Sequence, residues 1–257
     1  MYPVLFRIGT FEVTSFGAMV ALGALLGILL LRRELIRSKL NEGEGTDAAM
    51  VGVLGGLAGA KLLFVFEHWG EGLASTLLNR GGLSWFGGLA GGVLAGLAYM
   101  RWRRLPLIGV LAAAAPALTL GQAVGRIGCF LVGDDYGKPT SLPWGVAFPH
   151  GLPPTLQRVH PTQLYESAFL FLFTILLVRW RRHGMADLKV IAVYLLGAGT
   201  ERFFLEFIRI NIRVALGLTV AQWGSLSAVA VGAVLLVMAQ RQAAHGSGPA
   251  PAGSGRP

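Results

Sequence analysis

The stretch SFGAMVALGALLGILLL, residues 15–31, contains no charged residue and is followed at once by RRELIRSK, residues 32–39. About 20 apolar residues are needed to cross a bilayer as a helix. The stretch therefore predicts a membrane-spanning helix, and the arginines after it predict that its far end lies in the cytoplasm, where short loops carry an excess of Lys and Arg. A cleaved signal peptide would carry its positive charges before the apolar stretch, so we expect this segment to be retained.

The composition of the whole chain also indicates a membrane protein. Of its 257 residues, 54% are hydrophobic and 14% are charged, against about 25% charged residues in soluble domains. The formal charge of +9 is spread over short loops between apolar stretches, which excludes nucleic-acid binding as the main function. The single cysteine excludes an internal disulfide and a thiolate-rich metal site.

Seven stretches are apolar and long enough to be spans. They lie near residues 15–31, 48–66, 82–100, 105–132, 162–178, 190–208 and 214–240. Most of the Lys and Arg residues follow the first, third, fifth and seventh of them. The pattern predicts an all-α integral membrane protein with about seven transmembrane helices, its N-terminus outside and its C-terminus cytoplasmic. We expect a membrane domain over residues 1–240 and a disordered cytoplasmic tail, rich in Gly, Pro and Ser, over residues 241–257.

Small residues recur four positions apart in the second and third predicted spans. Gly55 and Gly59 are such a pair, and Gly88, Gly92 and Gly96 continue the same spacing. Glycines four apart lie on one face of a helix and let two helix backbones approach closely in the membrane. We interpret this pattern as a helix-packing signal and assign it no chemistry.

Charged residues inside spans are costly and mark functional candidates. The fourth predicted span ends in GRIGCFLVGDDYG, residues 125–137, and the sixth contains GTERFFLEFIR, residues 199–209. If both segments are helical, one face of the fourth span carries Arg126, Cys129, Gly133 and Asp134, and one face of the sixth carries Arg202, Glu206 and Arg209. Two such faces together predict a cationic pocket that suits an anionic phosphate, which a guanidinium group binds by paired hydrogen bonds.

Each of these residues also has a plainer interpretation. Arg202 and Glu206 could form a pair that only joins helices, whereas Arg126 has no carboxylate four residues away and needs a partner on another helix or a ligand. Lys61 could extend to the membrane interface. Cys129 is more typical of a small buried apolar residue than of a nucleophile.

A third motif, HPTQLYES at residues 160–167, opens the fifth predicted span. Pro161 suits the first turn of a helix. Tyr165 could belong to the aromatic belt at the interface. A cluster of His, Gln, Tyr and Glu at one membrane depth nevertheless favours a binding role.

Taken in order, GGLSWFGGLAGG (residues 81–92), GRIGCFLVGDDYG, HPTQLYE and ERFFLEFIR resemble the motifs of the prolipoprotein diacylglyceryl transferase family. The resemblance runs from about residue 15 to about residue 235. It implies a multi-pass enzyme of the bacterial cytoplasmic (inner) membrane. That enzyme would transfer a diacylglyceryl group from phosphatidylglycerol to the lipobox cysteine thiol in a prolipoprotein signal peptide and release glycerol phosphate. The resemblance also implies lateral entry of phospholipid from the surrounding membrane lipids, no metal and no organic cofactor.

The resemblance assigns roles by position. It places Arg126 at the phosphatidylglycerol headgroup, and it matches Arg202 and Glu206 to the family's essential arginine and the glutamate four residues later. With Asp134, these form the expected catalytic set. The expected substrate-binding set is Arg126, Gly137, His160, Gln163, Tyr165, Glu166, Arg209, Lys61, Phe86 and Cys129.

The chain departs from the family pattern at several positions. Phe86 stands where members commonly have His or Tyr, Phe16 stands for Tyr, Cys129 and Val132 stand for Asn, and Asp134 stands for Glu. A Phe ring can neither donate nor accept a proton. The retained groups are thus mostly those that would hold phosphate, and Asp134, Glu206 and Glu166 remain as candidates for the base that accepts the thiol proton.

Two other functions remain open. A divergent paralogue would bind an anionic phospholipid but use a different acceptor, which fits the loss of polar groups on the acceptor side. A non-catalytic lipid-binding membrane protein or a small transporter would use the Arg and Glu faces without chemistry. The acceptor, the general base and the oligomeric state are left undetermined by the sequence.

Overall fold

The computed structural model describes residues 4–9, 11–78 and 84–246 of the chain. It divides into two compact units, one made of residues 1–27 and 115–257 and the other of residues 28–114. Two long helices, α1 (Ser15–Arg37) and α5 (Leu107–Val132), each contribute to both units. The predicted tail is described only up to residue 246, and residues 247–257 lie outside the described part.

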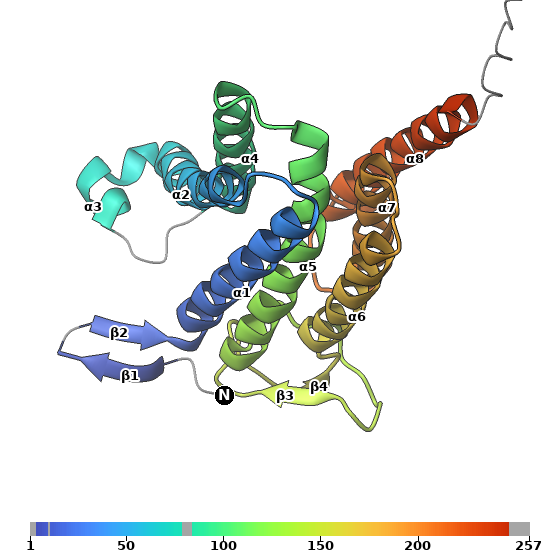
Figure 1. Ribbon diagram of the computed structural model, residues 1–257. Coiled ribbons are helices and arrows are strands. Elements are labelled where there is room, and N and C mark those ends of the chain that lie inside the picture. The colour runs from blue at the N-terminus through green and yellow to red at the C-terminus, as the bar shows by residue number, and fades with distance from the viewer. Residues whose placement is uncertain (1–3, 10, 79–83, 247–257) are drawn as a thin grey trace, which may run out of the picture. The chain divides into compact units, whose positions relative to one another are not determined.

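Helices make up most of the chain, as predicted, and the seven expected spans each overlap one of them (Figure 1). The remaining helices are α2 (Glu42–Glu67), α3 (Leu73–Leu78), α4 (Trp85–Trp102), α6 (Thr162–Arg182), α7 (Asp187–Leu205) and α8 (Val220–Gly246), with short 3-10 turns η1 (Trp69–Glu71) and η2 (Glu206–Ile208).

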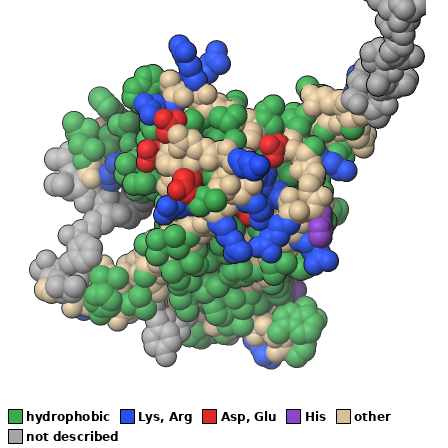
Figure 2. Space-filling model, in the orientation of Figure 1, with side chains coloured by type: hydrophobic (Ala, Val, Ile, Leu, Met, Phe, Trp, Pro, Cys, Tyr) green, Lys and Arg blue, Asp and Glu red, His purple; other side chains and the backbone are tan. Residues whose placement is uncertain are grey.

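Five of the described helices, α1, α2, α5, α6 and α8, are long and apolar enough to cross a membrane. Hydrophobic side chains also cover much of the surface seen in Figure 2. The chain is therefore a mostly helical membrane protein. The two other expected spans correspond to α4, with 18 residues, and to α7, which carries charged residues at both ends.

Three two-stranded antiparallel hairpins accompany the helices. They pair β1 (Val4–Ile8) with β2 (Phe11–Thr14), β3 (Val146–Phe148) with β4 (Thr155–Val159), and β5 (Arg213–Ala215) with β6 (Leu218–Thr219). The expected seventh span began at residue 214, but α8 begins only at Val220. Leu216 and Gly217 both have positive φ, of 52° and 71°, which turns the chain back into a hairpin at this place.

In the unit of residues 28–114, α2 packs against α4 through the predicted glycine faces. A Cβ atom on Gly55 would lie 2.9 Å from the carbonyl oxygen of Gly91, and one on Gly56 would lie 3.2 Å from that of Gly88. Such contacts leave no room for larger side chains, so the interpretation of the spacing as a packing signal is confirmed.

In the other unit, side-chain hydrogen bonds fix α6 against α5. The Ser167 hydroxyl donates to the carbonyl of Ala123 at 2.9 Å, and the Thr174 hydroxyl donates to the Thr119 hydroxyl at 2.8 Å. These bonds set the depth of α6 relative to α5. The motif at the start of α6 is thereby held level with the end of α5.

The segment between α5 and α6 has a small aromatic core of its own. Tyr136 stacks on Phe148 with ring centroids 5.3 Å apart, and Val159 completes the cluster. The Tyr136 hydroxyl donates to the carbonyl of Pro153 at 2.7 Å. This packing holds the chain that leaves α5 close to the start of α6, where the candidate site lies.

Candidate active site

Three arginines surround the carboxylate of Glu166, which is fully buried on α6. Arg126 of α5 lies 2.9 Å from Oε1, and Arg202 of α7 lies 3.4 Å from Oε2. Arg209, just after η2, lies 3.7 Å from Oε2, and the amide of Gln122 donates to Oε1 at 3.0 Å. The predicted convergence of the charged faces of the fourth and sixth spans is therefore present, and the buried Glu166 lies at its centre.

Two further carboxylates complete this arginine cluster. Asp135 bridges two of the arginines, with Oδ2 2.8 Å from Arg126 Nη1 and Oδ1 in contact with Arg209 Nη2. Glu206 lies 2.9 Å from Arg202 Nη2 and accepts a hydrogen bond of 2.5 Å from the amide of Asn211. Three guanidinium groups thus face three carboxylates, and their charges balance.

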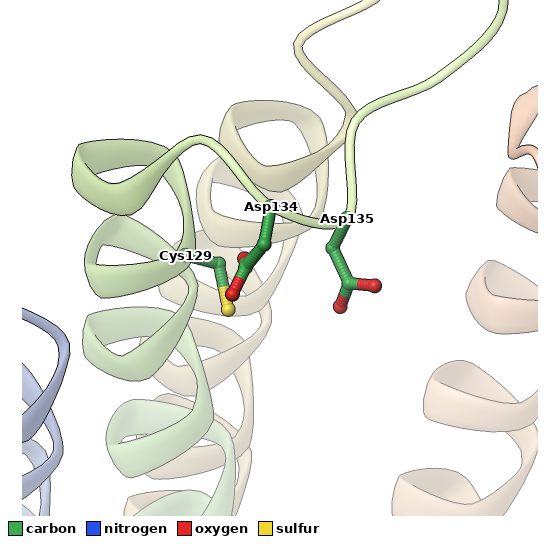
Figure 3. Close-up of side chains that lie close together, drawn as sticks. All are labelled: Cys129, Asp134 and Asp135. Carbon is green, nitrogen blue, oxygen red and sulfur yellow. The ribbon is translucent and has the colours of Figure 1, made fainter. Parts of the chain in front are cut away.

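The chain beyond α5 does not continue the helix as the sequence suggested. The helix ends at Val132 because Gly133 has a φ of 79°, so the prediction that Gly133 and Asp134 continue the helical face of Arg126 was wrong. The reversal instead returns Asp134 over the end of the helix, beside Cys129 (Figure 3). Asp135 follows with a φ of 59° and points toward the arginines.

Residues of the HPTQLYE motif hold this reversal in place. The Thr162 hydroxyl donates to the carbonyl of Asp135 at 2.8 Å, and the Gln163 amide donates to the carbonyl of Asp134. Both side chains are fully buried. Thr162 is thus part of the support of Asp135.

Gly137 lies where three segments meet. A Cβ atom there would be 2.7 Å from the carbonyl oxygen of Ile208 and 2.9 Å from Cβ of His160. The Gly137 amide donates to the carbonyl of His160 at 2.9 Å. The position requires glycine for packing, and the expected role of Gly137 in substrate binding stays a prediction.

His160 and Tyr165 lie apart from the arginine cluster, although they belong to the same motif as Glu166. The indole of Trp144 donates to the Tyr165 hydroxyl at 2.8 Å, and His160 Nδ1 lies 3.3 Å from the same oxygen. Because α6 turns by about 100° per residue, neighbours in the motif face different directions. The structure therefore divides the expected binding residues of this motif into two groups.

Cys129, Asp134 and Asp135 bring three potential metal-ligand atoms within 4.8 Å of one another (Figure 3). Asp135 is already paired with two guanidinium groups, and Arg126 Nη1 lies 3.9 Å from Cys129 Sγ. Positive charges at this distance oppose a divalent cation. We therefore assign the cluster no metal.

The neighbouring carboxyl groups of Asp134 and Asp135 differ in acidity. Burial, and then the negative charge of Asp135, raise the pKa of Asp134. Burial would also raise the pKa of Asp135, but the guanidinium of Arg209, followed by that of Arg126, outweighs burial and holds this pKa below its ordinary value. Two adjacent carboxyls whose pKa values are pushed apart suit different roles.

Several departures from the family pattern lie beside this site. A Cβ atom on Gly128 would be 3.4 Å from Cα of Phe16, so Phe16 packs against α5 within one turn of Arg126. Val132 is buried at the end of α5. Lys61 on α2 and Phe86 on α4 belong to the other unit, and their expected substrate-binding roles stay predictions.

Three residues of the site were not identified from the sequence. Gln122 stands four positions before Arg126, so its place on the same helix face was a usable signal. Asp135 was missed because a continuous helix would have turned it away from Arg126. Asn211 lies beyond η2 and carried no periodic signal.

The fold and the site together define a polytopic membrane protein with a cluster of three arginines and three carboxylates at one end of its helices. The family model described as prolipoprotein diacylglyceryl transferase matches residues 3–238. The chain belongs to the prolipoprotein diacylglyceryl transferase family.

Curated relatives match over most of their length. The chain is 32% identical over 237 residues to the phosphatidylglycerol–prolipoprotein diacylglyceryl transferase of Clostridium tetani, covering 90% of this chain and 95% of the relative. It is 34% identical over 223 residues to the protein of the same name from Parasynechococcus marenigrum, covering 81% and 80%. For the protein of that name from Gloeobacter violaceus the identity is 31% over 258 residues, covering 96% of each chain.

Proposed function

We propose that this chain transfers the diacylglyceryl group of phosphatidylglycerol to the lipobox cysteine of a prolipoprotein and releases glycerol phosphate. The observation that carries the proposal is the cluster of Arg126, Arg202 and Arg209 around Glu166. The family match and the names of the relatives support the reaction itself.

The arginine cluster would bind the phosphate by exchanging partners. Asp135 bridges Arg126 and Arg209 in the way that two oxygens of a phosphate would, and its side chain is 43% exposed. An incoming phosphate replaces this carboxylate on the accessible side. Glu166 stays behind the arginines, fully buried, and keeps them aligned.

At the glyceryl carbon the reaction forms one bond and breaks one, and the thiol loses its proton to a base. The acceptor sulfur attacks the glyceryl carbon that bears the phosphate, the C–O bond breaks, and its electron pair leaves on the phosphate oxygen. Arg126 and Arg202 stabilise the charge that develops on this leaving group, which is the electrostatic contribution expected to dominate such catalysis. The thiol proton must pass to a base, because a thiol is mostly protonated at neutral pH.

Asp134 is the candidate base that the geometry favours. Glu166 and Glu206 are both engaged by arginines, whereas Asp134 forms no ion pair with any residue in the described part of the chain. One of its carboxyl oxygens is buried without a hydrogen-bond partner among those residues. Its raised pKa makes it a better proton acceptor than an ordinary aspartate.

The orientation of the site fits an exported acceptor. Arg126 lies near the end of α5, Glu166 near the start of α6 and Arg202 near the end of α7, so all three occupy the same end of the helices. The opposite end of α6 carries Arg179, Arg181 and Arg182, which are typical of the cytoplasmic side. In a seven-span arrangement with the N-terminus outside, the site faces the outer leaflet of the bacterial cytoplasmic membrane, where a prolipoprotein signal peptide would meet it.

Complementation tests the proposal directly. Expressed in cells depleted of their own prolipoprotein transferase, the chain should restore growth and lipoprotein modification. Good membrane expression without modification would contradict it. In that case the replaced Phe16 and Cys129 would favour the paralogue with a different acceptor, and labelled phosphatidylglycerol bound without turnover would favour a non-catalytic lipid-binding protein.

A second test uses purified protein and phosphatidylglycerol labelled in its glyceryl group. Arg126→Ala and Arg202→Ala should each abolish transfer to a lipobox peptide. Arg7→Ala is the matched control, because Arg7 is exposed and pairs with Glu12 in the β1–β2 hairpin. Near wild-type turnover in Arg202→Ala would refute the assignment of the site.

A further inference from the structure

Glu201 borders a groove that the reaction described above does not use. The groove lies between α6 and α7 and has a volume of about 660 Å³. Its walls are mainly apolar and include Phe169, Phe173, Leu196 and Phe204. Because Arg202 is the next residue along α7, the groove and the arginine cluster adjoin at consecutive positions of one helix.

The Glu201 carboxyl has no hydrogen-bond or ion-pair partner among residues 4–9, 11–78 and 84–246. Arg202, its neighbour in sequence, is engaged with Glu166 and Glu206 instead. The three guanidinium groups of the cluster are already paired with Glu166, Asp135 and Glu206, and none of them forms an ion pair with Glu201. An unpaired carboxylate is unfavourable in apolar surroundings, so we expect the Glu201 carboxyl to be protonated. Its O–H group is then a hydrogen-bond donor without an acceptor.

An acyl chain is the occupant that matches this groove. The helix between Val193 and Glu201 covers eight residues, or about 12 Å of groove length. In a diacyl phospholipid the ester carbonyls lie between the phosphate and the acyl chains. A lipid with its phosphate in the arginine cluster, beside Arg202, therefore brings an ester carbonyl to the level of Glu201 and continues as hydrocarbon along Leu196 and Phe173.

We propose that Glu201 donates a hydrogen bond to an ester carbonyl of the bound phospholipid, whose acyl chain lies in the groove between α6 and α7. The inference rests on the proposed function for the identity of the phosphate ligand. It makes Glu201 a specificity residue that distinguishes ester-linked from ether-linked lipids, because an ether oxygen is a weaker acceptor and stands without a carbonyl.

Lipid displacement tests this assignment. The full-length protein in detergent micelles is loaded with a fluorescent phosphatidylglycerol, which is displaced by unlabelled ester-linked or ether-linked phosphatidylglycerol of equal chain length. One hydrogen bond corresponds to a preference for the ester lipid of roughly 5-fold to 10-fold. Glu201→Leu should remove the preference by weakening the ester lipid alone, whereas Glu201→Gln, whose amide N–H also donates, should keep it.

Two further variants separate the parts of the inference. Asp187→Asn also removes an acidic group from α7, but Asp187 is paired with Arg181 at the far end of the helix. The preference of this variant for the ester-linked lipid should therefore equal that of the wild-type protein. Leu196→Trp fills the groove and should weaken both lipids alike. An unaltered preference in Glu201→Leu, or unaltered binding in Leu196→Trp, would overturn the inference.

Turnover distinguishes this inference from the proposed function. If the wild-type protein shows the ester preference but transfers nothing to a lipobox peptide, the proposed function fails and the role of Glu201 stands. If it transfers the diacylglyceryl group of the ester lipid and the dialkylglyceryl group of the ether lipid equally well, with equal KM, the proposed function stands and the role of Glu201 is refuted.

Discussion

Asp135 Oδ2 lies 2.8 Å from Arg126 Nη1, although the two residues stand nine positions apart on either side of the end of α5. The contact exists because the chain reverses at Gly133. It places a carboxylate of this chain where a phosphate oxygen of the lipid would bind. If the lipid phosphate binds as proposed, Asp135 competes with it for the same guanidinium group.

Asp135→Asn should strengthen the binding of phosphatidylglycerol several-fold, because it removes the competing charge and keeps the shape of the side chain. The measurement is displacement of fluorescent phosphatidylglycerol at neutral pH, where the lowered pKa keeps Asp135 ionised. Weaker binding would instead mean that Asp135 serves mainly to position Arg126 and Arg209.

Glu166→Gln should destabilise the protein by about 3 to 5 kcal/mol, because it leaves buried guanidinium groups without their shared counter-charge. Thermal unfolding in detergent measures the effect. Glu12→Gln is the control, since Glu12 pairs with Arg7 at the surface, where such pairs contribute little. Equal stability of the Glu166→Gln and wild-type proteins would show that the arginines are held by other contacts.

Asp134→Asn should lower kcat at every pH and remove the acidic limb of the pH profile. A base must be deprotonated to act, so activity falls as the pH drops through its pKa. The pKa of Asp134 is raised, mainly by burial, so the wild-type limb should lie above the ordinary aspartate value of about 3.9. If the limb persists in Asp134→Asn, another group accepts the proton.

Phe86→His should leave transfer unchanged or raise it. Phe86 is 53% exposed on α4, so the substitution sacrifices little packing and adds a group that can exchange protons. Phe66→His, on the exposed side of α2, is the matched control and should have no effect. A loss of activity confined to Phe86→His would show that the apolar ring itself is required.

Gly55→Ala should destabilise the packing of α2 against α4 by about 1 to 3 kcal/mol, because the new methyl group meets the Gly91 backbone. Gly125→Ala on α5 is the control, since nothing lies within 4 Å of its Cβ position among the described residues. The two variants can be compared by thermal unfolding in the same detergent. A more stable Gly55→Ala protein would contradict the close packing.

The predictions from the sequence were correct where the chain forms regular helices. The apolar stretches predicted the helices, and the absence of a carboxylate four residues from Arg126 correctly indicated a partner on another helix, which is Glu166. Helical periodicity failed at Gly133, where a positive φ ends α5, and at Leu216–Gly217, where two positive φ angles form a hairpin turn in place of the expected start of the seventh span. Asp135 could not be placed from the sequence, because its position depends on that reversal and on a hydrogen bond from Thr162, which lies 27 positions later in the chain.

The pairing of charges in the cluster also has a consequence for the insertion of the protein into the membrane during its synthesis. Arg202 meets Glu206 within its own segment of chain, whereas Arg126 on α5 depends on Glu166, which follows 40 positions later on α6. While the ribosome is still making α6, the guanidinium of Arg126 can pair with Asp135 but lacks its buried counterion Glu166. We therefore expect α5 to insert stably only together with α6.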